Sequence, residues 1–117
     1  MSFLLETGGI WRRLRVIAVM YTGVSIVCKR RAGQFLITER PYCVINGMET
    51  RPLAWDQSTF VPLVPNYPYQ LSVQFPYMGK ACGVATFTVT LRPGEAQLFE
   101  YKTPFVIFSQ GSVKKKA

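Results

Sequence analysis

The chain has 117 residues, of which 49% are hydrophobic and 17% are charged. A chain of this length forms one domain, and its hydrophobic fraction excludes intrinsic disorder as the main state. The formal charge of +8 at pH 7, taken as one number, is typical of proteins that bind nucleic acid or a membrane surface.

This charge is confined to the two ends of the sequence. Residues 1–31 have a net charge of +5, residues 32–113 hold five cations and five anions, and Lys114, Lys115 and Lys116 add +3. We therefore expect a neutral folded body between two basic termini.

The residue types that most catalytic sites need are absent or scattered. The chain has no histidine, which excludes His-based acid–base catalysis, His-activated nucleophiles and zinc sites with imidazole ligands. The six carboxylates show no spacing typical of an acid/base pair, and no phosphate-binding glycine loop or nucleophile motif occurs. We predict that the chain is not an enzyme and has no catalytic residue, metal or cofactor.

The three cysteines, Cys28, Cys43 and Cys82, are widely spaced and odd in number. Neither a secreted disulfide framework nor a C-x-x-C motif fits this pattern. We expect free thiols in a reducing cytoplasm, and a single Cys28–Cys43 or Cys43–Cys82 bridge is the alternative.

Residues 1–23 are predicted to be an N-terminal extension, either an added strand or a membrane-associated segment. An uncharged stretch of 13 residues, Val16–Cys28, lies between basic clusters and is too short to span a bilayer as a helix, which needs about 20 residues. Two strands, roughly 14–20 and 24–30, are favoured. A membrane-associated segment is one alternative, and translation that begins at Met20 is another.

The segment from Pro41 to Pro68 shows strong turn signals. Residues 42–45 and 48–53 flank Asn46-Gly47, which predicts a hairpin because this pair suits the positive φ values of a type I′ turn. A short apolar run, 60–64, is broken by Pro62. Two prolines within residues 65–68 predict a loop there.

The remaining segments alternate with a period of two residues. Apolar positions alternate with polar ones over 69–75 and again over 86–91, and each pattern predicts a strand with one core face. Residues 76–80 connect these strands, 92–95 form a turn, and a last strand covers 99–102. We predict an all-β fold, an antiparallel β-sandwich of about seven strands, with residues 24–111 as the domain and 112–117 as a basic tail.

The order of these signals resembles a PEGA-like β-sandwich, as found in small actinobacterial proteins of unknown function. The resemblance rests on Val44–Gly47, on Val64–Asn66 and, most specifically, on the R-P-G-E-x-Q-x-F-x-Y-x-x-P run at Arg92–Pro104. Asn66 stands where such domains often carry Gly. The resemblance implies an Ig-like or PEGA-like fold and no catalytic residues.

Two groups of residues are candidate contact sites. Aromatic and methionine side chains in loops suit a protein interface, so we predict partner binding by Tyr67, Tyr77, Met78, Phe105 and Phe108. Cations near the termini suit an anionic surface, so we predict such contacts for Arg12, Arg13, Arg15, Lys114, Lys115 and Lys116.

These features favour a non-enzymatic interaction or accessory subunit that docks on a larger protein assembly through a sheet edge and its aromatic-proline loops. The alternatives are a nucleic-acid-associated structural protein that uses its basic termini, and a peripheral membrane adaptor. The expected partner is a protein or a second copy of the chain, and no small-molecule substrate is evident. We expect a cytoplasmic protein, with a position peripheral to the membrane as the alternative.

Overall fold

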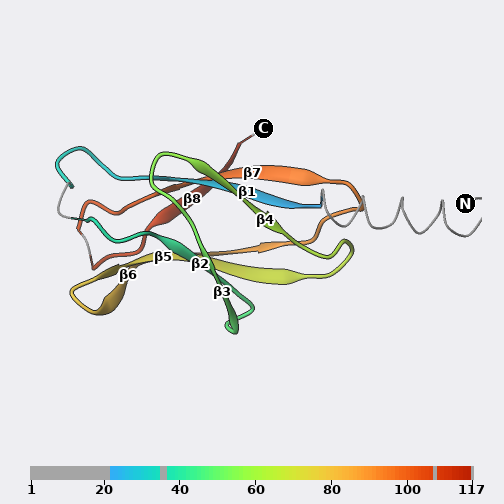
Figure 1. Cartoon of the computed structure of the whole chain (residues 1–117), viewed down its shortest axis with the longest axis horizontal. Coiled ribbons are helices and arrows are strands. Elements are labelled where there is room, and N and C mark those ends of the chain that lie inside the picture. The colour runs from blue at the N-terminus through green and yellow to red at the C-terminus, as the bar shows by residue number, and fades with distance from the viewer. Residues whose placement is uncertain (1–21, 35–36, 107, 117) are drawn as a thin grey trace, which may run out of the picture.

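The computed structural model describes residues 22–34, 37–106 and 108–116, and these residues form eight strands and no helix (Figure 1). One sheet has the order β4-β1-β7-β8 and the other the order β3-β2-β5-β6. The first contains β1 (Gly23–Lys29), β4 (Ser58–Pro62), β7 (Ala96–Lys102) and β8 (Ser112–Lys116). The second contains β2 (Tyr42–Ile45), β3 (Glu49–Pro52), β5 (Tyr69–Tyr77) and β6 (Lys80–Val89). The predicted all-β, sandwich-like architecture is confirmed.

The core lies between the two sheets and follows the period-two pattern. Leu71, Val73 and Phe75 on β5 are fully buried, as the alternation of that segment predicts. Val24 and Ile26 on β1 face them from the other layer and are also fully buried. The two layers therefore share one continuous apolar core.

The pairing of β1 with β7 is parallel, which differs from the purely antiparallel sheet that we expected. The register runs from Gly23 opposite Ala96 to Lys29 opposite Lys102, whereas every other pairing between these strands is antiparallel. Local residue patterns report which face of a strand is buried, but they carry no information about the direction of a neighbour some 70 residues away.

Two hairpins have left-handed turn residues. Asn46 and Gly47 both have positive φ values, as the type I′ signal predicts, although three residues separate the paired Ile45 and Glu49. The second hairpin joins β5 to β6 through Met78 and Gly79, with φ values of 52° and 77°. The sequence marks this second turn only as a connection.

Two further sequence predictions differ from the structure, and a third concerns residues that the structure does not describe. The segment 112–116, expected as a basic tail outside the sandwich, is edge strand β8, and its half-buried Val113 packs on the core. Strand addition by a lysine-rich segment suits a sheet edge, because lysines discourage further pairing there. The described residues form eight strands rather than about seven, because β8 joins the sheet. The predicted strand 14–20 lies outside the described residues.

Candidate docking surface

Three connections gather at one end of the sandwich, seen on the left in Figure 1. They are the segment from β1 to β2, the β5–β6 hairpin and the segment from β7 to β8. Lys29 and Lys102 pair where β1 and β7 end, and Tyr77 pairs with Lys80 at the hairpin. The register of the strands thus places connections from distant parts of the sequence beside one another.

Large apolar side chains project into solvent from this end. The exposed fractions are 80% for Met78, 83% for Phe105, 64% for Val106 and 66% for Phe108. The ring of Phe108 lies 6.2 Å, centroid to centroid, from that of the half-buried Tyr77, so the hairpin and the β7–β8 connection touch. We call these five residues the apolar end.

Met78 is unfavourable in two respects, because its apolar side chain is exposed and its backbone is left-handed. Besides glycines, the described residues with positive φ are Asn46, Asp56, Asn66 and Met78. Asn and Asp tolerate the left-handed region, but a methionine there has no such local compensation. Met78 therefore combines an exposed apolar side chain with a strained backbone, which makes it a candidate contact residue.

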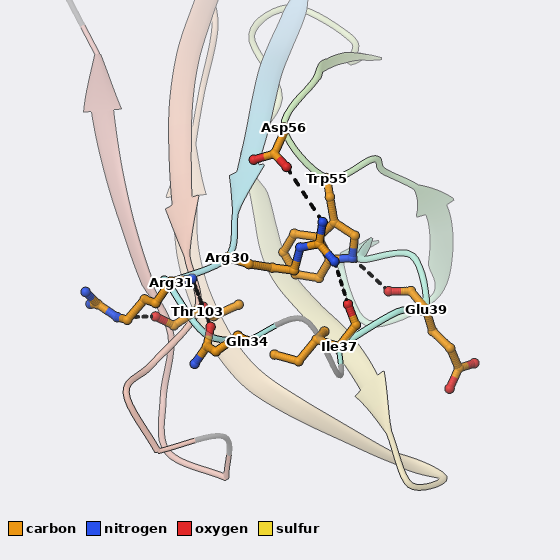
Figure 2. Close-up of polar contacts among 8 residues, drawn as sticks. All are labelled: Arg30, Arg31, Gln34, Ile37, Glu39, Trp55, Asp56 and Thr103. Atoms are coloured by element: carbon orange, nitrogen blue, oxygen red, sulfur yellow. Dashed lines mark hydrogen bonds and ion pairs between the residues drawn. The ribbon is translucent and has the colours of Figure 1, made fainter.

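The β1–β2 connection is held in place by contacts with Trp55 (Figure 2). The guanidinium of Arg30 lies over the indole at 5.3 Å from the ring centroid, and its Nη1 donates a hydrogen bond of 2.8 Å to the carbonyl of Ile37. The indole N–H donates to the carbonyl of Glu39 at 2.9 Å. Asp56 lies 3.7 Å from the Arg30 guanidinium, and this pair contributes little because both side chains are partly exposed.

A second cluster ties the β1–β2 connection to the β7–β8 connection. The backbone N–H of Arg31 donates to Gln34 Oε1 at 2.9 Å and to Thr103 Oγ1 at 3.1 Å, and the Thr103 hydroxyl donates to Gln34 Oε1. Arg31 Nε donates to the Thr103 carbonyl at 2.7 Å, and Gln34 Nε2 donates to the Pro104 carbonyl at 2.8 Å. Phe105, the next residue, lies 3.8 Å from the Arg31 guanidinium carbon. The network fixes the base of the apolar end.

The structure separates the predicted partner-binding residues into two places. Tyr77, Met78, Phe105 and Phe108 lie together, and Val106, which the sequence analysis did not single out, joins them. Tyr67 precedes β5, whereas Tyr77 ends it, so Tyr67 lies at the opposite end of the sandwich, where it packs 5.0 Å from Tyr69. Its exposed fraction of 52% makes it accessible, but not as part of the apolar end.

The basic residues predicted to contact an anionic surface are placed only in part. Arg12, Arg13 and Arg15 lie outside the described residues. The Lys116 side chain lies 3.1 Å from Glu100 on β7. A hydrogen bond from Lys116 lowers the pKa of Glu100, so this lysine is partly neutralised by its neighbour. Lys114 and Lys115 are exposed along the same edge.

Charged side chains surround the exposed apolar groups at both ends of the sandwich. Around the apolar end the cations outnumber the nearby carboxylates Glu39, Asp56 and Glu100, of which Asp56 and Glu100 face cations. These cations are Lys29, Arg30, Arg31, Lys80 and Lys102. At the opposite end Met48, Val64 and Tyr67 are also exposed, but Glu49 pairs with Arg51 there and Glu95 accepts a bond from the backbone of Arg92. Arg92 and the lysines of β8 also lie toward this second end, so cations accompany exposed apolar groups at both ends in the described part of the chain.

The three thiols and the Tyr101 hydroxyl are withdrawn from solvent. Cys28, Cys43 and Cys82 are free and buried. Burial raises the pKa of the Cys28 thiol to about 12 and that of Cys43 to about 11, so both stay protonated at neutral pH. Tyr101 is buried as well, its pKa is raised, and its hydroxyl donates to the Gly83 carbonyl at 2.5 Å.

The described residues contain neither a metal-binding cluster nor a helix that could span a membrane. These residues hold no group of three His, Cys, Asp or Glu side chains able to bind a metal ion. They also contain no helix with the length and apolar character needed to cross a membrane. No family model, curated protein or solved structure matches the chain.

Proposed function

We propose that this chain is a non-enzymatic accessory subunit that docks on a larger protein assembly through its apolar end. One observation carries the proposal: four exposed apolar side chains project from two connections that touch each other above a hydrogen-bonded base. Aromatic, methionine and arginine side chains dominate the energetics of protein interfaces.

The hydrogen-bonded base favours a protein surface as the partner. A folded protein presents fixed pockets, and a docking surface whose side chains are already held loses less conformational entropy on binding. Arg31, Gln34 and Thr103 provide this order for the connection that carries Phe105. Fluid lipid would not require such order.

The expected affinity is modest. Full burial of an apolar side chain is worth about 1.5–3 kcal/mol, so four such side chains supply about 6–12 kcal/mol before any cost. Association itself costs roughly 4–15 kcal/mol. Further contacts would be needed for a long-lived complex, and the outermost strands β3 and β6 of the second sheet are candidates for them.

The finer fold and the location belong to the same proposal. A PEGA-like or Ig-like sandwich is supported by the two four-stranded sheets and by the turn at Arg92–Glu95, where Gly94 has the positive φ that the turn requires. A cytoplasmic location is supported by the three free cysteines.

A nucleic-acid-associated role is the second candidate, and one observation favours it. Gly23 pairs with Ala96, and Lys116 pairs with Leu98 only two residues along the same strand. The basic strand β8 therefore runs toward the end of the sandwich where β1 begins, and its lysines lie near that end. Three lysine contacts with nucleic acid predict a log–log salt slope of about −3, which retention on heparin across salt concentrations would measure.

A photo-crosslinking pair tests the leading proposal. A photoreactive phenylalanine analogue replaces Phe105 in one variant and Tyr67, an exposed aromatic residue at the opposite end, in the other. In native cells we expect one defined protein to be crosslinked from position 105 and not from position 67. Equal crosslinking from both positions, or none from 105, would overturn the proposal. A product of twice the chain mass would also overturn it, because the partner would then be a second copy of this chain.

A further inference from the structure

A basic cleft opens beside the apolar end. It encloses about 410 Å³ and is lined by Lys29, Arg30, Arg31, Ala32, Gly33, Gln34, Lys102 and Phe105. Four of these eight residues are cationic and none is acidic. Phe105 belongs both to this cleft and to the apolar end, so a partner that covers the apolar end also reaches the cleft.

The cations in the cleft are incompletely neutralised by the protein. Lys29 and Lys102 are direct partners on adjacent strands, an arrangement of like charges that disfavours folding. Lys29 reaches Glu100 only at 4.0 Å, and Glu100 is shared with Lys116 at 3.1 Å. Arg30 pairs with Asp56, and Lys102 helps to lower the pKa of Glu100. Among the described residues no carboxylate forms an ion pair with Lys102 or Arg31.

Arg31 is held in a conformation suited to an oxyanion. Its Nε donates to the Thr103 carbonyl at 2.7 Å, and its guanidinium carbon lies 3.8 Å from the centre of the Phe105 ring. No acceptor for its terminal nitrogens occurs in the described part of the chain. A guanidinium fixed at Nε and supported by an aromatic ring presents two parallel N–H groups, the geometry that binds phosphate.

We propose that this cleft binds a phosphate monoester carried on a side chain of the docking partner. A doubly charged group matches Lys29, Arg31 and Lys102 better than a single carboxylate does. The Arg30 guanidinium is engaged by Trp55, Ile37 and Asp56 and is not counted among the binding groups. The identity of the partner as a protein rests on the proposed function, whereas the phosphate site itself does not.

Titration of the full chain with inorganic phosphate, followed by ¹H–¹⁵N NMR at constant ionic strength, tests the site. We expect saturable shifts of the Gly33 and Gln34 amides. Lys102→Gln removes a positive charge, and Arg31→Lys removes the paired N–H groups of the guanidinium. Each should weaken phosphate binding about tenfold, because each loses a charge-assisted hydrogen bond. Arg92→Gln at the opposite end is the matched control and should leave binding unchanged. Shifts spread along β8, or equal affinity in Lys102→Gln, would overturn the site.

The source of the phosphate is tested separately. Phosphopeptides and their unphosphorylated forms are compared with vesicles that contain phosphatidylglycerol, a phosphodiester lipid. Binding of phosphopeptides that depends on Lys102 supports a protein partner. Tighter, Lys102-dependent binding of the vesicles would overturn it. Because none of these measurements needs the exposed Met78 or Phe108, they remain informative if the crosslinking experiment fails.

Discussion

Thr103→Val removes the hydroxyl that links the two connections under the apolar end and keeps the shape of the side chain. Thr103 is fully buried, and its Oγ1 accepts a bond of 3.1 Å from the Arg31 N–H and donates one to Gln34 Oε1. Valine retains the β-branch, so the core packing around this position is preserved.

The expected loss of stability depends on which hydrogen bonds remain after the substitution. Two hydrogen bonds of about 0.5–1.5 kcal/mol each are lost. The Arg31 N–H still donates to Gln34 Oε1 at 2.9 Å, so it is not left without an acceptor. We expect the free energy of unfolding to fall by about 1–3 kcal/mol.

Urea denaturation and amide hydrogen exchange measure the two consequences. Thr103→Val should lower the urea midpoint and speed exchange at Arg31. Thr103→Ser is the control, because it loses one methyl group, worth about 0.8 kcal/mol, but keeps the protection of the Arg31 amide. Unchanged exchange at Arg31 in Thr103→Val, with a midpoint equal to that of the wild type, would refute the linking role of this hydroxyl.

Three further outcomes are expected. Met78→Asn should raise the free energy of unfolding by about 1 kcal/mol in thermal unfolding, because asparagine suits the left-handed φ of 52°. The same variant should weaken docking. A less stable variant would contradict the strain at this turn. Gly83→Ala should lower the free energy of unfolding by more than about 2 kcal/mol, because a Cβ would lie 2.5 Å from side-chain atoms of Phe75 and Tyr101. Gly79→Ala is the control: its Cβ would enter open space, and the expected loss is about 1 kcal/mol. Equal urea midpoints for the two variants would exclude the clash. The folded-state pKa of Glu100 is lowered from 4.5, so its contribution to stability is present above that pH and is lost as the pH falls through the folded value. Glu100→Gln should therefore show a smaller loss of stability on acidification, and an unchanged acid profile would contradict this.

The sequence predicted the strands whose two faces differ and missed those decided by distant partners. The alternation over 69–75 identified Leu71, Val73 and Phe75 as core, and all three are fully buried. Strand β8 was missed because Val113 is its one half-buried position and the lysines around it read as a solvated tail. Its pairing depends on β7, which no local pattern reports.

The candidate site shows the same limit. Loop position alone indicated Tyr67 and Tyr77 as contact residues, but a strand of nine residues at about 3.3 Å per residue holds the two about 30 Å apart. The bonds that link Thr103 to Gln34 and to Arg31 join residues 69 and 72 positions apart, so no spacing in the sequence reveals them. The left-handed Met78 has no sequence signal beyond the glycine that follows it.

The central claim is that the apolar end is the docking surface, and the dissociation constant of the crosslinked partner tests it most directly. Loss of the Phe105 ring should cost about 1.5–3 kcal/mol, so Phe105→Ser should weaken binding about 10- to 150-fold. Met48→Ser, at an equally exposed hairpin residue of the opposite end, should leave the dissociation constant unchanged. Equal affinities for wild type and Phe105→Ser, or a loss confined to Met48→Ser, would contradict the claim.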